Sequence, residues 1–164
     1  MQANDIILKQ FEYNYWANGR VFEKVALVSA EDFNAQTVVE NRSLQQVLAH
    51  MVRVERIWRL LARDGKLNPQ DLPSEGELVI VDDIVDFAVG EEQEMRAYLA
   101  NLSPEDLAEE MVITRWDGVQ VTMTRWHMLV HLAMHSMQHR SEASVLLTQY
   151  GQSPGDLDFL FFVL

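Results

Sequence analysis

Four long stretches of this chain place apolar residues at intervals of three and four, the spacing of an amphipathic α-helix rather than of a strand. The pattern predicts helices over about residues 4–28, 43–63, 81–102 and 124–150. A helix with one apolar face must bury that face against a partner, and 164 residues suffice for one shared core. We therefore expect an all-α four-helix bundle that forms a single domain over residues 1–164.

The ends of these stretches carry capping signals. "SLQQ" predicts a capping box in which Ser43 accepts from a first-turn amide and Gln46 reaches back. Ser103, followed by a proline, predicts that the third helix has stopped there and that a new turn begins. Gly151 predicts a left-handed residue after the last helix. These signals set the boundaries of the bundle.

Residues 111–123, "MVITRWDGVQVTM", break the helical pattern between the third and fourth helices. Asp117-Gly118 lies between two runs of β-prone residues, which is a hairpin signal. The sequence therefore allows a short β-hairpin before the last long helix.

The charge balance excludes one class of partner. The chain has 25 acidic and 13 basic residues and a formal net charge of −12. A nucleic-acid-binding protein needs a basic patch to displace counterions from phosphates. We expect no nucleic-acid partner. Nine acidic residues and no basic one lie between Lys66 and Arg96, and we interpret this run as a solvated face.

The sequence lacks cysteine, long apolar runs and a signal-peptide pattern, which limits the possible metal ligands and the expected compartment. The chain has no cysteine, so a bound metal would need His, Asp or Glu ligands and any thiol would have to come from outside. No apolar run approaches the roughly 20 residues that span a bilayer, and the N-terminus lacks the pattern of a signal peptide. We expect a cytoplasmic protein with no membrane partner.

Four of the five histidines form a ladder in "WHMLVHLAMHSMQHR", at 127, 131, 135 and 139. A step of four residues advances a helix by about 6 Å and turns it by about 40°, so only neighbouring members can share one ion. The candidate pairs are 127/131, 131/135 and 135/139. A polar stripe without metal has the same spacing, so the ladder alone does not distinguish a metal site from a solvated polar face.

A helical wheel of the last helix separates these pairs. On a wheel that starts at Trp126, this residue and Met137 fall in the apolar arc. The first two histidines of the ladder then fall in the polar sector, His135 falls near its edge, and His139 falls inside the apolar arc. The pair that points most toward the interior is His135 and His139.

The fifth histidine, His50, lies on a face of the second helix with Val54, Ile57 and Leu61, so it too is expected to face the core. Three imidazoles from two helices match the protein ligands of an open metal site, which leaves a position for water or substrate. The alternative is that these are hydrogen-bonded packing residues, because a lone core histidine usually is one.

Several segments of the chain resemble the DinB/YfiT-like metal-binding four-helix bundles. They are "FEYNYWANGRVFEKV" near the start, "LAHMVRVER" in the second helix, "HSMQHR" in the fourth, and the tail "LLTQYGQSPGDLDFLFF". The resemblance implies a divalent-metal site of His50, His135 and His139. Here "HRSE" stands where the family often has His-Arg-Gly-Gln. Glu142 either orients the His139 ring or faces water.

The resemblance also implies chemistry. The family includes thiol-dependent S-transferases and isomerases, so we expect zinc or nickel, with iron as a further candidate, to activate a low-molecular-weight thiol against an electrophilic small molecule. A metal-dependent hydrolase and a non-catalytic, metal-binding or stress-associated bundle are the alternatives. Tyr15, Trp16, Asn18 and Arg140 are candidate substrate neighbours. A homodimer, common in the family, would cover the apolar tail "DLDFLFFVL".

Overall fold

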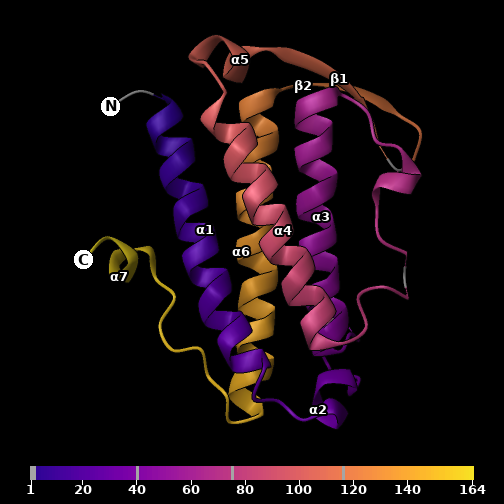
Figure 1. Cartoon of the computed structure of the whole chain (residues 1–164), viewed down its shortest axis with the longest axis vertical. Helices are drawn as coiled ribbons and strands as arrows, with labels where there is room; N and C mark the ends of the chain where they lie inside the picture. The colour runs from indigo at the N-terminus through magenta and orange to yellow at the C-terminus, as the bar shows by residue number, and fades with distance from the viewer. Residues whose placement is uncertain (1–2, 40, 75, 116) are drawn as a thin grey trace.

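A computed structural model describes residues 3–39, 41–74, 76–115 and 117–164. Within these ranges four long helices lie side by side (Figure 1). They are α1 (Ala3–Val25), α3 (Leu44–Asp64), α4 (Val81–Ala100) and α6 (Arg125–Gln149). α1 and α6 run in one direction and α3 and α4 in the other, so the connection from α3 to α4 returns along the length of the bundle (Figure 1). The predicted four-helix bundle is confirmed.

Short elements lie at the two ends of the bundle and along its sides (Figure 1). They are α2 (Ala30–Asn34), the 3-10 turn η1 (Pro69–Asp71), α5 (Pro104–Ala108), β1 (Glu110–Thr114), β2 (Gln120–Thr124) and α7 (Phe159–Val163). β1 and β2 pair antiparallel, with Ile113 opposite Val121, and the hairpin leads directly into α6. The hairpin allowed by the sequence is thus present, although Trp116 in its turn lies outside the described residues.

The capping signals act as expected. The Ser43 side chain accepts from the Gln46 amide, and the Gln46 side chain accepts from the Ser43 amide, which forms the capping box of α3. Ser103 and Asp106 form a second capping box at α5. Gly151 follows α6 with φ of 75°, the left-handed conformation that glycine adopts without cost.

The apolar core forms two clusters, one toward each end of the bundle. Each long helix contributes to both clusters, and each places buried polar residues between them. We call these residues the central polar layer: Asn14, Asn18, Glu55, Arg59, Glu91, Ser136, His139 and Arg140. A layer of buried polar groups costs free energy unless its members are paired, so their partners matter for function.

Two expectations about orientation are wrong. Trp126 and Met137 are 43% and 50% exposed, so they do not belong to the buried arc of α6. The buried arc is instead centred on Leu132 and Ser136, because α3 and α1 both pack on that side. The acidic run is not wholly solvated either, since Glu91 is buried; Glu75 in the same run lies outside the described residues.

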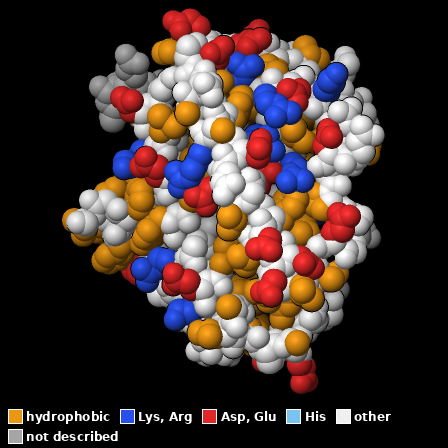
Figure 2. Space-filling model, in the orientation of Figure 1, with side chains coloured by type: hydrophobic (Ala, Val, Ile, Leu, Met, Phe, Trp, Pro, Cys, Tyr) orange, Lys and Arg blue, Asp and Glu red, His pale blue; other side chains and the backbone are white. Residues whose placement is uncertain are grey.

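The C-terminal tail returns along α1. Tyr13 donates a hydrogen bond of 2.7 Å to the carbonyl of Leu157, and the Phe162 ring lies against Tyr13 and Trp16. The rest of α7 stays exposed and contributes to the hydrophobic patch at the left of Figure 2. Intrachain packing therefore covers the tail only in part. Within the described residues, no helix combines the length and the apolar character needed to cross a membrane.

Candidate metal centre

His50, His135 and His139 meet at the seam between α3 and α6. One ring nitrogen from each lies within 4.8 Å of the other two. The helices run antiparallel, so His50 near the start of α3 reaches the middle of α6, where the i, i+4 pair presents both rings on one face. His139 is buried at 4% exposure, whereas His50 and His135 are half-buried. The predicted trio is brought together, with one side open to solvent.

The distances suit a metal ion. The Nε2 atoms of His135 and His139 are 3.2 Å apart. With metal–nitrogen distances of about 2.0 to 2.1 Å, two ligands of a tetrahedral ion lie roughly 3.3 Å apart. The His50 ring approaches from the side, with its centroid 4.7 Å from that of His139 and an interplanar angle of 83°. The three rings therefore surround a common point rather than stack.

Glu142 fixes the orientation of one ring. Its Oε2 atom lies 2.6 Å from Nδ1 of His139, so Nδ1–H donates to the carboxylate and Nε2 carries the free lone pair. That lone pair faces the Nε2 atom of His135, and two such atoms at this distance repel unless a proton or a cation lies between them. The Nδ1 atom of His135 is buried and has no hydrogen-bond partner within the described residues. This donor set fits a divalent cation.

The electrostatic environment favours neutral imidazoles. Burial, assisted by His139 and Arg42, lowers the pKa of His50 from 6.5 to about 4. Burial also lowers the pKa of His135 to about 4, and the neighbouring histidines add to the effect. Metal binding requires unprotonated rings, so these two residues are in the ligating form at neutral pH.

The other two histidines point outward, as the wheel predicts. His131 is exposed and lies edge-on to Trp58, with ring centroids 4.6 Å apart. His127 is exposed, and its Nδ1 atom lies 2.7 Å from the hydroxyl of Thr124. Neither belongs to the group of three.

The four candidate substrate neighbours have partners of their own. Tyr15 donates a hydrogen bond of 2.6 Å to Glu55, and Arg140 donates to Asn14 and Asn18 in the central polar layer. Trp16 packs on the tail. Each therefore has a packing role between α1 and its neighbours, and a role near substrate stays a prediction.

Sequence reasoning missed the buried charges. Glu91 on α4 accepts from both Arg56 and Arg59 of α3, and we call these three residues the Glu91 ion-pair cluster. Glu55 is fully buried, and burial raises its pKa to about 7. The signal was present: Glu91 lies seven residues after buried Ile84 and four before buried Met95, so it occupies the apolar stripe of α4.

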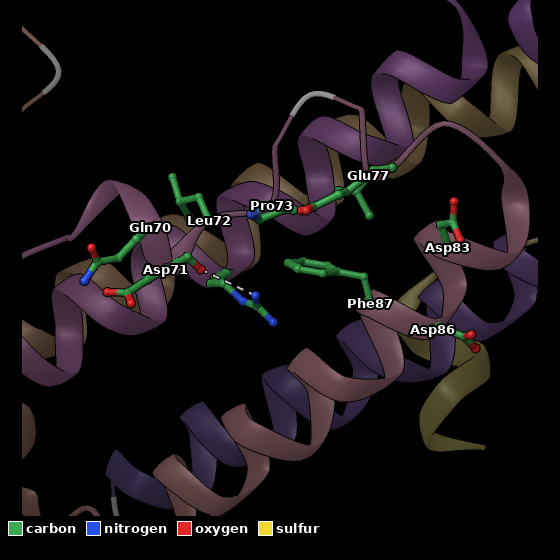
Figure 3. A pocket seen from close by; sticks show the side chains of 10 residues that line it. Gln70, Asp71, Leu72, Pro73, Glu77, Asp83, Asp86 and Phe87 are labelled. Carbon is green, nitrogen blue, oxygen red and sulfur yellow. Dashed lines mark hydrogen bonds between the residues drawn. The ribbon is translucent and has the colours of Figure 1, made fainter.

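A cavity of about 450 Å³ lies elsewhere, between α3, η1 and the start of α4 (Figure 3). Phe87 points into it, and the Arg56 guanidinium lies over the Phe87 ring at 4.0 Å. Asp83, Asp86 and Glu77 are exposed at its edge, as expected for a solvated acidic face. No histidine lines this cavity, so it is separate from the candidate metal centre.

Comparisons with known proteins agree with this fold. The curated protein DinB of Bacillus subtilis (strain 168) is 20% identical over 161 residues, which cover 95% of this chain and 92% of that protein. The crystal structure of a DinB-like protein from Bacillus subtilis superposes with a TM-score of 0.68 at 16% identity and covers 88% of this chain and 93% of its own. A conserved protein from Enterococcus faecalis gives a TM-score of 0.67 at 17% identity, with 92% and 98% covered.

These structural likenesses establish the fold. A family model described as the DinB family matches residues 1–163. The chain belongs to the DinB family.

Proposed function

We propose that this protein is a cytoplasmic, divalent-metal-dependent enzyme that activates a small thiol for attack on an electrophilic small molecule. The observation that carries the proposal is the convergence of His50, His135 and His139 at a half-open seam. Imidazole ligands suit zinc, nickel and iron, of which zinc and nickel are our first candidates. Three neutral ligands leave the ion its full charge, which holds a thiol as thiolate near neutral pH.

The residues of this chain have separate tasks in the proposal. His50, His135 and His139 bind the ion, and Glu142 holds the His139 ring with Nε2 directed at it. The half-buried edges of His50 and His135 leave a path for a thiol to approach. The same site could activate water instead, and a metal-dependent hydrolase is the closest alternative.

A second candidate function is a non-catalytic, metal-stabilised bundle. The observation that favours it is the position of the ligands, because an ion shared by α3 and α6 would link two helices of the core. The two candidates differ in one respect: only the enzyme needs an exchangeable position on the metal.

The experiment therefore measures both metal content and thiol coordination. Chelator-free protein is loaded with Co²⁺, and absorption spectra are recorded with and without a small thiol. The enzyme predicts stoichiometric Co²⁺ and a thiolate-to-cobalt charge-transfer band, both lost in His139→Ala and retained in His127→Ala, an exposed histidine on the same helix. Stoichiometric metal without the band supports the structural role. Absence of metal from the wild type refutes both.

We also propose that a second copy of this chain covers the outer face of α6. Trp126, Met134, Met137 and Val145 are 43–58% exposed there, and none of the exposed residues of α6 carries a formal charge. In a chain of net charge −12, such a face can meet its own copy without repulsion. Light scattering should give a dimer for the wild type and a monomer for Met134→Glu; a monomeric wild type refutes the proposal.

A further inference from the structure

Arg53 has no hydrogen-bonded or ion-paired partner within residues 3–39, 41–74, 76–115 and 117–164. Arg42 has an interaction of its own, and each of the other arginines in those ranges has a hydrogen-bonded or ion-paired partner. The chain offers 25 acidic side chains to 13 basic ones, so partners are abundant. Arg53 is nevertheless half-buried and unpaired. A guanidinium in that state has unused donors.

The position of Arg53 connects it to the candidate metal centre. It follows His50 by three residues on α3, so the two side chains are neighbours on the helix surface. Its positive charge contributes to the low pKa of His50, after the larger effects of burial, His139 and Arg42. Glu142 is the acidic group that acts on His50, and it is already bonded to His139. Arg42 has an interaction of its own. Arg53 is thus the free cation at the edge of the histidine cluster within the described residues.

We infer that Arg53 binds an anionic group, a carboxylate or a phosphate, of the small thiol that reaches the His50–His135–His139 site. The inference rests on the proposed function and names its substrate class. The planar guanidinium presents paired donors that match a carboxylate or phosphate in two parallel hydrogen bonds. A lysine would supply charge without that geometry.

Because the whole protein is negatively charged, an anionic thiol needs a cationic side chain such as Arg53 in order to bind. A net charge of −12 repels anions from most of the surface. An anionic thiol therefore needs a local positive field, which Arg53 and Arg42 provide beside His50. An uncharged thiol of the same length would gain nothing from Arg53. The selectivity between two such thiols is the quantity to measure.

The test uses the Co²⁺-loaded protein and a matched pair of probes, 3-mercaptopropionate and 3-mercapto-1-propanol. Their dissociation constants are obtained by titration of the charge-transfer band. We expect Arg53→Gln to weaken 3-mercaptopropionate binding about tenfold, in line with the loss of a charge-assisted hydrogen bond, and to leave 3-mercapto-1-propanol unchanged. Arg53→Lys should recover part of the loss. Arg63→Gln, which alters an exposed arginine of α3 paired with Asp64, should change neither constant.

The outcomes separate the two proposals. If Arg53→Gln changes both constants equally or neither, the anion-binding role is overturned, while Co²⁺ uptake leaves the metal site intact. If the wild type takes up no Co²⁺, the proposed function and this inference both fail. Thermal melting of Arg53→Gln identifies a folding defect. In that case the Arg53→Lys variant, which keeps the charge, takes its place. A lower preference for 3-mercaptopropionate over 3-mercapto-1-propanol than in the wild type then supports the anion-binding role, and an unchanged preference overturns it.

Discussion

The Glu91 ion-pair cluster and the histidine cluster (His50, His135 and His139) both include residues of α3, yet they differ in how completely their polar atoms are paired. Both carboxylate oxygens of Glu91 accept from arginines, and the group is closed within the chain. In the histidine cluster two Nε2 atoms face each other at 3.2 Å, and Nδ1 of His135 has no partner within the described residues. The polar atoms of the first cluster are paired within the chain, whereas the second keeps an unpaired ring nitrogen within the described residues. Self-sufficient groups stabilise a fold, whereas incomplete ones indicate a ligand.

The largest expected effect is a loss of stability when the Glu91 ion-pair cluster is disrupted. Glu91→Ala leaves Arg59, which is 4% exposed, with only the exposed Glu94 carboxylate at 3.7 Å. Removal of one partner of a buried ion pair costs about 3–5 kcal/mol, and urea unfolding of metal-free protein measures it. The exposed Asp86→Ala should cost less than about 0.5 kcal/mol. Metal content should not change in either variant. A loss in Glu91→Ala as small as that in Asp86→Ala would show that the cluster contributes little.

The next largest effect is a gain in stability when a metal ion binds to the histidine cluster. A metal at 100 times its dissociation constant should raise the free energy of unfolding by about 2.7 kcal/mol, because it binds only the folded chain. Thermal melts with and without zinc should show the gain in wild type and in His127→Ala and lose it in His50→Ala. An equal gain in all three proteins would place the ion outside the cluster.

A smaller effect is expected from the Glu142 carboxylate, which contacts Nδ1 of His139. Glu142→Gln removes the negative charge that holds the His139 ring, and such partners are worth about 10- to 100-fold in metal affinity. Competition with a chromophoric chelator measures the change. Ser141→Ala, next to it and exposed, serves as the control. Unchanged affinity in Glu142→Gln would mean that the contact of 2.6 Å does not orient the ligand.

The smallest effect is a pH dependence of the metal-free protein. The pKa values of His50 and His135 fall from 6.5 to about 4 on folding, so between these values the unfolded chain binds more protons. Their contribution to stability therefore declines as the pH drops from 6.5 toward 4. Glu55 acts in the opposite direction: its pKa rises from 4.5 to about 7, so its contribution declines as the pH rises through that range.

Melting temperatures at pH 5 and pH 6.5 distinguish these groups. Compared with wild type, the increase in melting temperature from pH 5 to pH 6.5 should be smaller in His135→Gln and larger in Glu55→Gln. The same increase in all three proteins would contradict the assignment of neutral histidines to the histidine cluster.

The sequence predicted well what depends on local signals. Helical periodicity, the capping residues Ser43 and Ser103 and the turn at Gly151 act within a few residues, so the bundle and its boundaries follow from them. The sequence also pointed to the three histidines that the structure brings together, because the helical wheel and the family resemblance both favoured His50, His135 and His139.

What depends on neighbouring helices was not predicted. Trp126 is apolar but exposed, and Glu91 is charged but buried, because burial is decided by which side of each helix meets another. That Arg53 has no ion-paired partner within the described residues is likewise visible only from the positions of the neighbouring helices. Single-helix patterns carry no information about these contacts.

The most direct test is the metal content of chelator-free protein, measured by elemental mass spectrometry for wild type, His50→Ala, His139→Ala and His127→Ala. We expect close to one zinc or nickel per chain in wild type and His127→Ala, and loss of the ion in the other two variants. A wild type that contains no metal and cannot be reloaded with zinc or nickel would contradict this expectation, and the three converging rings would then be a hydrogen-bonded packing cluster.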